Sequence, residues 1–232
     1  MSIAGLQKTS LIDYPGLVSC VLFLTGCNFT CPYCHNPELA RGRLPAGGAM
    51  PLGEVVAFLE ERRGFLDAVV ITGGEPTLSA DLVDLCRAVK SLGYRLKLDT
   101  NGSRPQVLAR LMEAGLVDYL AMDLKTLPEA YAPHLSPRPC AQALTDSIRI
   151  IRTSGLPHEF RTTCVRPFVD LDRIAAMARC IAGAPLYALQ ALQTESLLNP
   201  DFFPASPGPF TPSEMAQLRT IAAPHVQRCI LR

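Results

Sequence analysis

The stretch GCNFTCPYCH, residues 26–35, holds three cysteines close together: Cys27, Cys31 and Cys34, spaced C-x3-C-x2-C. Thiolates this close in sequence can hold three corners of one iron–sulfur cluster, and three protein ligands leave the fourth iron open. An open iron binds a further ligand. The spacing therefore indicates a site for chemistry and not only for electron storage.

A structural zinc site is the alternative for this stretch, with His35 as a fourth ligand. Structural zinc usually takes its ligands as two short pairs, and no second pair is present. The other six cysteines are scattered, mostly in apolar stretches, where cysteine packs as a small hydrophobic side chain: Cys20, Cys86, Cys140, Cys164, Cys180 and Cys229. We favour the cluster and keep a non-enzymatic zinc-binding module as the alternative.

The composition is that of an ordinary globular chain. The 232 residues are 48% hydrophobic, and 22 Lys and Arg against 21 Asp and Glu give a net charge of +1. This balance gives no sign of a nucleic-acid partner. Because no apolar run is long enough to span a membrane and the N-terminus lacks a signal peptide, we expect a cytoplasmic protein without a membrane partner. Unpaired cysteines fit that reducing compartment.

Near-continuous apolar runs alternate with segments of helical periodicity along the chain. Such runs are typical of strands covered on both faces. The predicted strands are residues 17–24, 65–72, 94–99, 117–123, 159–165, 186–192 and 226–231. Repeated strand–helix units imply parallel strands with right-handed crossovers. We therefore predict an α/β fold, an incomplete (β/α) barrel of about six parallel strands in a single domain, 1–232, with an open doubly wound sheet as the alternative.

Several helix ends carry local signals. Ser79 is a candidate N-cap, Asp170 opens another helix, and Thr211-Pro212-Ser213-Glu214 reads as a capping box. Two segments, 36–51 and 199–211, lack periodicity and contain several prolines. We predict loops there, with a docking surface or lid as the alternative.

Polar motifs follow three of the predicted strands: Gly73-Gly74-Glu75-Pro76, Asp99-Thr100-Asn101-Gly102 and Asp123-Leu124-Lys125. The cysteine stretch follows the first strand in the same way. Ligands of such folds gather beyond the C-terminal ends of the strands. Paired glycines let backbone approach a ligand closely, and Glu75 can accept a hydrogen bond from an ammonium group. We therefore expect these segments to contribute to one site.

With these motifs, the chain resembles the radical S-adenosylmethionine (radical SAM) superfamily. The hallmark of that superfamily is C-x3-C-x2-C with an aromatic residue, here Tyr33, before the third cysteine. The resemblance implies a [4Fe-4S] cluster held by Cys27, Cys31 and Cys34. It also implies that the amino and carboxylate groups of S-adenosylmethionine chelate the fourth iron.

The resemblance also implies roles for the other motifs. Gly73, Gly74 and Glu75 correspond to a motif that binds the methionine amino group. The remaining cosubstrate contacts are expected from Tyr33, His35, Asp99, Thr100, Asn101, Asp123 and Lys125. Lys125 suits the carboxylate as a compact positive charge.

Asp99 and Asp123 lie at the ends of neighbouring predicted strands. With the cosubstrate carboxylate they would place three anionic groups around Lys125 alone, so we expect the two aspartates to share a monovalent cation with that carboxylate. Removing Na⁺ and K⁺ should then weaken cosubstrate binding, whereas an unchanged affinity would reject the idea.

Two further stretches narrow the resemblance. Cys34-His35-Asn36 is shared by activases of glycyl-radical enzymes, and GLQKTSLIDYPG, residues 5–16, looks like anaerobic ribonucleoside-triphosphate reductase activating proteins. The implied reaction uses an electron from flavodoxin or ferredoxin to cleave S-adenosylmethionine to methionine and a 5′-deoxyadenosyl radical. That radical then removes a Cα hydrogen from a glycine of the partner enzyme. The cosubstrate carries the chemistry, which fits a chain without a Ser/His/Asp arrangement.

Beyond about residue 127 the resemblance is only general. Arg161, Thr163, Arg166 and Gln190 could face the cavity or make structural hydrogen bonds. The alternative activity is a radical enzyme acting on a small molecule, similar to 7-carboxy-7-deazaguanine synthase. The sequence names neither the partner enzyme nor its glycine.

Overall fold

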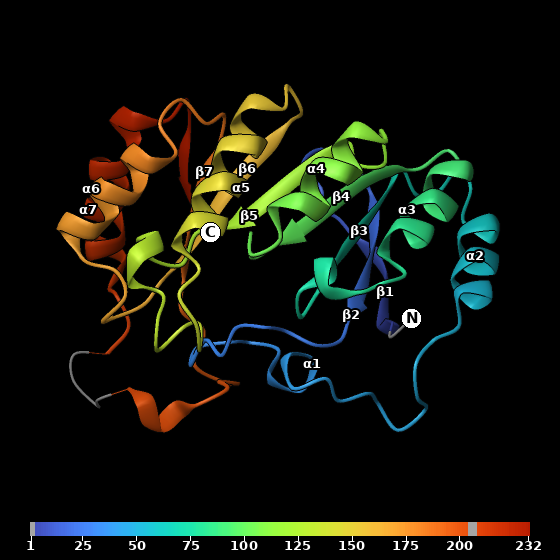
Figure 1. Ribbon diagram of the computed structural model, residues 1–232, viewed down its shortest axis with the longest axis horizontal. Helices are drawn as coiled ribbons and strands as arrows, with labels where there is room; N and C mark the ends of the chain where they lie inside the picture. The colour runs from blue at the N-terminus through green and yellow to red at the C-terminus, as the bar shows by residue number, and fades with distance from the viewer. Residues whose placement is uncertain (1–2, 204–207) are drawn as a thin grey trace. The chain divides into compact units, whose positions relative to one another are not determined.

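The computed structural model describes residues 3–203 and 208–232 (Figure 1). The chain divides into two compact units built from interleaved segments. Unit 1 comprises Met1–Asn28, Glu38–Thr100 and Gln106–Leu120, and unit 2 comprises Phe29–Pro37, Asn101–Pro105 and Ala121–Arg232. The single domain expected over residues 1–232 stays a prediction.

The strands follow one another in sequence order, β1 to β8, in one sheet. In unit 1, β1 (Ile3–Ser10) pairs antiparallel with β2 (Ser19–Leu24). The pairs of β2 with β3 (Ala68–Gly73) and of β3 with β4 (Arg95–Thr100) are parallel. The C-terminal ends of β2, β3 and β4 therefore lie at the same end of the sheet. The cysteine stretch and two of the polar motifs begin there.

Strand β5 (Tyr119–Asp123) begins in unit 1 and ends in unit 2. Unit 2 continues with β6 (His158–Cys164), β7 (Tyr187–Ala191) and β8 (Cys229–Leu231), and both pairs in that series are parallel. All seven predicted strands are present, with ends shifted by a few residues. The predicted α/β class, with parallel strands joined by helices, is confirmed.

Helices connect the strands (Figure 1). They are α1 (Pro37–Ala40), α2 (Leu52–Glu61), α3 (Leu82–Ser91), α4 (Pro105–Glu113), α5 (Ala141–Thr153), α6 (Leu171–Cys180) and α7 (Pro212–Ala222), with short 3-10 helices η1 (Pro76–Leu78), η2 (Pro128–Ala130), η3 (Pro200–Phe202) and η4 (Ala223–His225). In unit 1, α3 packs against α2 and β4, and in unit 2, α7 packs against α6, β7 and β8. Across the described residues, none of the helices has the length and apolar character that crossing a membrane requires.

The sequence does not predict β1. Its residues Gln7, Lys8 and Thr9 are exposed, and shifts in register interrupt its pairing with β2. Among the described strands it pairs with β2 alone, so it is an edge strand of the sheet. A strand of this kind lacks the continuous apolar run by which buried parallel strands are recognised.

The capping box at α7 is confirmed. The Thr211 hydroxyl accepts a hydrogen bond from Glu214 N at 3.3 Å, and Glu214 Oε2 accepts one from Thr211 N at 2.8 Å. Asp170 also caps α6 as predicted, because its Oδ1 accepts from Arg173 N at 2.7 Å. These bonds, which are reciprocal at α7, satisfy backbone donors that the first helical turn leaves without partners.

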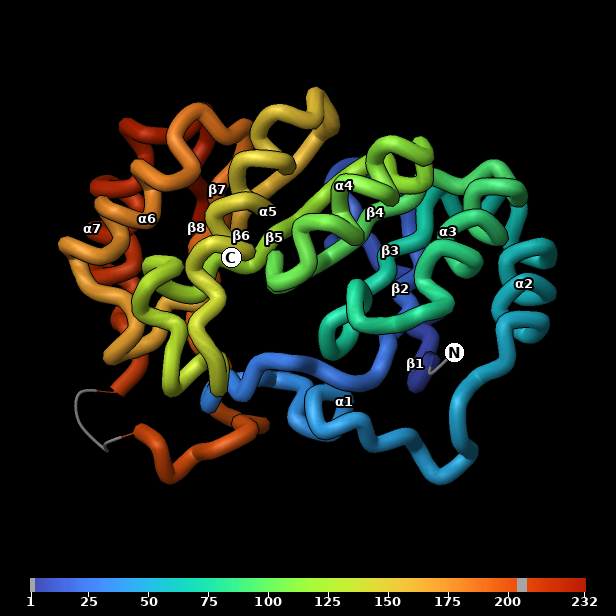
Figure 2. The backbone as a smooth tube through the Cα atoms, in the orientation of Figure 1, coloured from blue at the N-terminus to red at the C-terminus, as the bar shows by residue number. Residues whose placement is uncertain are grey.

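Two other local predictions need correction. Ser79 is not an N-cap, because Asp81 precedes α3 and Ser79 instead follows η1. The predicted loop 36–51 contains α1 and then runs without a helix to α2 (Figure 2). The predicted loop 199–211 includes η3, and its residues 204–207 lie outside the described residues.

Candidate functional site

In unit 1, the motif Gly73-Gly74-Glu75 lies against the start of the cysteine stretch. Gly74 N donates to Leu24 O at 2.8 Å, and Glu75 N donates to Gly26 O at 2.7 Å. A Cβ added to Gly74 would lie 2.1 Å from Gly26 O. The sequence indicates that these glycines lie close to a ligand. In the structure, a side chain at either position is already excluded by the backbone that leads into Cys27.

The backbone of Cys27 is fixed from a second direction by α1. Gly26 N donates to Leu39 O at 2.7 Å, and Cys27 N donates to Ala40 O at 3.1 Å. Hydrogen bonds to two segments, the Gly74-Glu75 motif and α1, therefore hold the backbone that leads into and includes Cys27. The short helix α1 was missed in the sequence because four residues are too few to show a helical period.

Glu75 has a buried and oriented carboxylate. Its side chain is 1% exposed, and Oε1 accepts hydrogen bonds from Thr77 N at 3.1 Å, from the Thr77 hydroxyl, and from the Thr100 hydroxyl at 2.9 Å. The carboxylate thus caps η1 and joins the end of β3 to the end of β4. Thr77 was not predicted, although an acidic residue before Pro76 is a recognisable signal for the start of a helical turn.

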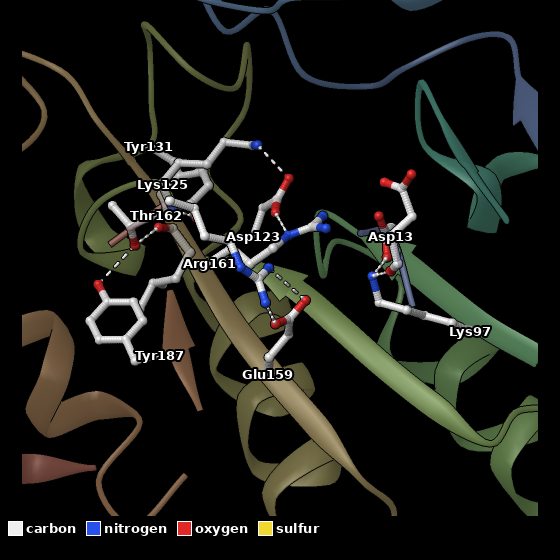
Figure 3. Close-up of polar contacts among 12 residues, drawn as sticks. Asp13, Lys97, Asp123, Lys125, Tyr131, Glu159, Arg161, Thr162 and Tyr187 are labelled. Atoms are coloured by element: carbon white, nitrogen blue, oxygen red, sulfur yellow. Dashed lines mark hydrogen bonds and ion pairs between the residues drawn. The ribbon is translucent and has the colours of Figure 1, made fainter. Parts of the chain in front are cut away.

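A second polar group in unit 1 surrounds Lys97 on β4. The Lys97 amino group donates to Asp13 O at 2.6 Å (Figure 3). The same amino group lies 2.9 Å from Asp99 Oδ1. Lys97 is 2% exposed, so its charge sits in a largely dry environment beside the aspartate. The assumption that Lys125 alone offsets the negative charge of the motifs is therefore wrong, because Asp99 has its own cation.

In unit 2, Asp123 lies between two cations at the end of β5. Arg161 Nε is 2.8 Å from Asp123 Oδ1, and Lys125 Nζ is 3.3 Å from Oδ2 (Figure 3). Lys125 is held in turn through its backbone, which donates to the Tyr131 hydroxyl at 2.8 Å. Arg161 lies on the neighbouring strand β6, and its contact with Asp123 is a structural pairing of the kind expected for it.

The charges of this group stabilise one another. Burial by itself raises the pKa of Asp123, but Arg161 and Lys125 outweigh it and lower that pKa to about 2. Burial likewise lowers the pKa of Lys125, and Asp123 outweighs it, so the pKa of the amino group lies well above its usual range. At neutral pH the carboxylate, the amino group and the guanidinium are all charged.

This lowered pKa predicts a dependence of stability on pH. The pKa of the Asp123 carboxyl is about 2 in the folded protein and about 3.9 in the unfolded chain. Its stabilising contribution is therefore complete above pH 4 and is lost as the pH falls toward 2. We expect wild type to lose more free energy of unfolding than Asp123→Asn between pH 6 and pH 3, measured by urea denaturation. Asp84→Asn, whose side chain is 69% exposed, is the control. Equal losses in wild type and Asp123→Asn would contradict the assignment.

The rest of the cysteine stretch belongs to unit 2. Cys34 N donates to Cys31 O at 3.0 Å, and Thr30 N donates to Leu135 O at 2.9 Å. Tyr33 is 4% exposed, and its ring centre lies 5.7 Å from that of Phe168. The loop between Cys31 and Cys34 is therefore a tight turn that carries a buried aromatic ring.

The Tyr33 hydroxyl is buried and has no hydrogen-bond partner among residues 3–203 and 208–232. Burial raises the pKa of this phenol well above its usual range, so it stays neutral. Buried polar atoms nearly always have partners, and an exception in a native fold calls for an explanation. A polar group of a ligand beside the cysteine stretch would supply one.

The other predicted site residues are less informative. His35 is exposed, and the Asn101 side chain accepts a hydrogen bond from Ser103 N at 2.9 Å, which is a turn-stabilising contact. None of the nine cysteines, all of which lie within the described residues, forms a disulfide. Within the described ranges, no three His, Cys, Asp or Glu side chains are gathered as ligands of a single metal ion.

Comparisons with known proteins agree with these motifs. A family model described as the radical SAM superfamily matches residues 21–181. A protein of Methanocaldococcus jannaschii named "Putative glycyl-radical enzyme activating enzyme" is 33% identical over 238 residues, which cover 99% of this chain and 95% of that protein. The similarity therefore extends over both units.

Solved structures resemble the chain in fold. A domain of pyruvate-formate lyase-activating enzyme from Bacteroides vulgatus aligns with a TM-score of 0.57 at 16% identity, over 71% of this chain and 98% of that one. Streptococcus suis SuiB bound to S-adenosylmethionine aligns with a TM-score of 0.57 at 16% identity, over 75% of this chain. This chain spans 42% of the SuiB chain. At these identities the likeness concerns the fold alone.

Proposed function

This chain belongs to the radical SAM superfamily and to the family of glycyl-radical enzyme activating enzymes, and we propose that it generates a glycyl radical on a partner enzyme. The observation that carries the proposal is a relative 33% identical over nearly the whole length, named for this activity. The motif C-x3-C-x2-C with Tyr33 before the third cysteine supports it.

We propose that Cys27, Cys31 and Cys34 hold a [4Fe-4S] cluster whose fourth iron takes S-adenosylmethionine. The residues fit such a group, because none of the three cysteines is used in a disulfide, and the hydroxyl of Tyr33, which precedes Cys34, is buried without a partner among the described residues. When bound, the cluster supplies the electron that cleaves S-adenosylmethionine and so provides the radical for hydrogen abstraction.

The protein residues bind and orient the cosubstrate in this proposal. Glu75 accepts the methionine amino group, since its buried carboxylate is already fixed by Thr77 and Thr100. Lys125, kept charged by Asp123, suits the cosubstrate carboxylate. Both side chains are held in position before the ligand arrives, which lowers the cost of binding.

Glu75→Gln tests the assignment of the amino group. The change keeps the shape of the side chain and removes its charge, so the loss of a charge-assisted hydrogen bond should weaken S-adenosylmethionine binding about 10- to 100-fold. Equilibrium binding to anaerobically reconstituted protein measures it. Glu60→Gln, an exposed glutamate of α2, is the matched control and should bind as wild type does. Wild-type affinity in Glu75→Gln would reject the role.

The partner we propose is an anaerobic ribonucleoside-triphosphate reductase, on the resemblance of residues 5–16, with flavodoxin or ferredoxin as the electron donor in the cytoplasm. The alternative substrate is a small molecule of the 7-carboxy-7-deazaguanine synthase type.

A monovalent cation between Asp99 and Asp123 stays a prediction. The excess of negative charge that motivated it is reduced within each unit, because Lys97 pairs with Asp99, and Arg161 with Asp123. Titration of S-adenosylmethionine in buffers without Na⁺ and K⁺ still decides the question.

The function is tested by incubating the reconstituted protein with S-adenosylmethionine, dithionite and the glycyl-radical enzyme encoded nearest to its gene. We expect the electron paramagnetic resonance doublet of a glycyl radical on the partner. Product formation from a purine-like acid, without a doublet, would favour the small-molecule alternative. If the protein contained zinc and no sulfide after anaerobic purification, both radical activities would be rejected in favour of a zinc-binding module.

A further inference from the structure

Unit 2 contains a cavity of about 760 Å³ whose lining includes none of the residues expected to hold the cluster or S-adenosylmethionine. It lies where the chain leaves β6 and β7, beside the first turns of α6 and α7. Its walls are mainly apolar and include Leu171, Leu197, Phe202, Phe203 and Phe210. This volume lies within the range of about 300–1,000 Å³ that is usual for binding pockets.

The charged groups that line the cavity are paired with one another. Arg166 Nη2 lies 2.7 Å from Glu214 Oε1, and the guanidinium stacks 3.9 Å above the Phe210 ring. Arg173 Nε lies 3.5 Å from Asp170 Oδ2. Two cations therefore face two carboxylates, and the lining presents no net charge. An occupant complementary to this lining is apolar and uncharged.

One wall of the cavity is connected to the cysteine stretch. The Phe202 ring stacks on Phe168 with centres 5.6 Å apart and planes within 5°, and Phe168 contacts Tyr33 at 5.7 Å. Asn199, just before η3, donates from its backbone to Pro32 O at 2.9 Å. The ring of Phe168 therefore links the cavity wall at Phe202 to Tyr33, the residue that precedes the third cysteine.

We propose that this cavity docks an uncharged segment of the glycyl-radical enzyme, rich in aromatic or aliphatic side chains, and so holds the partner beside the cysteine stretch. The proposal rests on the proposed function, which requires a protein substrate. The lining supplies apolar contact without an opposing charge, and burial of large side chains in such pockets dominates the affinity of protein interfaces. Leu171, at the first position of α6, is 49% exposed, so this part of the apolar lining is accessible to a partner.

Two substitutions test the docking site in opposite directions. Leu171→Glu places a carboxylate in the apolar lining, and the start of a helix tolerates that charge well. Gln217→Leu enlarges the apolar wall on α7, and a gain of binding does not arise from misfolding. Phe65→Glu is the control, because Phe65 is 73% exposed and lies in unit 1.

The first measurement uses the uncharged fluorophore N-phenyl-1-naphthylamine with the reconstituted protein. We expect one saturable site, weakened at least about tenfold by Leu171→Glu and tightened about two- to fivefold by Gln217→Leu, with Phe65→Glu equal to wild type. Absence of saturable binding, or equal affinity in all variants, would overturn the proposal.

The second measurement is the partner concentration that gives half of the maximal glycyl-radical signal. We expect Leu171→Glu to raise it at least about tenfold and Gln217→Leu to lower it. A wild-type doublet whose half-maximal concentration does not respond to either change would overturn the docking site and leave the proposed function intact. If only the fluorophore responds, the cavity binds a small apolar molecule and not the partner. If wild type gives no doublet at all, the proposed function fails, and the docking site fails with it.

Discussion

Cys31→Ala is expected to abolish both the iron–sulfur chromophore and the release of 5′-deoxyadenosine. In a [4Fe-4S] cluster whose fourth iron binds the cosubstrate, the protein supplies only three ligands, and the cluster depends on all of them. Removing one thiolate leaves two, and the cluster is then open to solvent and to loss of iron. Iron and sulfide analysis after anaerobic reconstitution, with the visible absorption spectrum, measures the loss. The same result is expected for Cys27→Ala and Cys34→Ala.

Cys180→Ala provides the matched control. Cys180 ends α6, is partly buried and lies outside the C-x3-C-x2-C stretch, so its thiol serves only in packing. We expect the variant to keep wild-type iron content and wild-type release of 5′-deoxyadenosine. A Cys31→Ala protein that retains full iron and sulfide would contradict the assignment of the three ligands.

Gly74→Ala is expected to destabilise unit 1 by about 2–4 kcal/mol and to weaken cosubstrate binding with it. A Cβ on this residue would lie 2.1 Å from Gly26 O, and because the obstacle is backbone, it does not move aside by a change of rotamer. Relief requires Glu75 and the segment leading to Cys27 to separate, which breaks the hydrogen bond from Glu75 N to Gly26 O. Urea denaturation and S-adenosylmethionine titration measure the two effects.

Gly53→Ala is the control for this substitution. Gly53 lies in α2, and a Cβ there meets nothing within 4 Å. Alanine in a helix should therefore raise the free energy of unfolding by about 0.5–1 kcal/mol. If both variants were equally stable, the close packing of Gly74 would not be the constraint we infer.

The sequence was most informative where local chemistry decides the structure. Cysteine spacing, the alternation of apolar runs with helical periods, and the capping box of α7 each depend on residues near one another in the chain. Seven strands and the end of the sheet that carries the polar motifs were predictable for this reason. The edge strand β1 was not, because its residues carry no buried run.

Contacts between distant residues were the part that sequence reasoning missed. The pairing of Arg161 with Asp123, and the hydrogen bond from Thr100 to Glu75, each join residues that are far apart in the chain. The last pair also changes the interpretation of Thr100, which orients Glu75 and was expected only as a ligand contact. Apolar periodicity indicates which face of a strand is buried, but it gives no information on which polar side chains meet across that face.

The measurement that tests the account most directly is the release of 5′-deoxyadenosine. Protein reconstituted anaerobically with iron and sulfide is given S-adenosylmethionine and dithionite, and the products are separated by chromatography. We expect 5′-deoxyadenosine and methionine in equal amounts from wild type, and neither from Cys31→Ala. Wild-type protein that carries a full cluster and releases no 5′-deoxyadenosine would contradict the account.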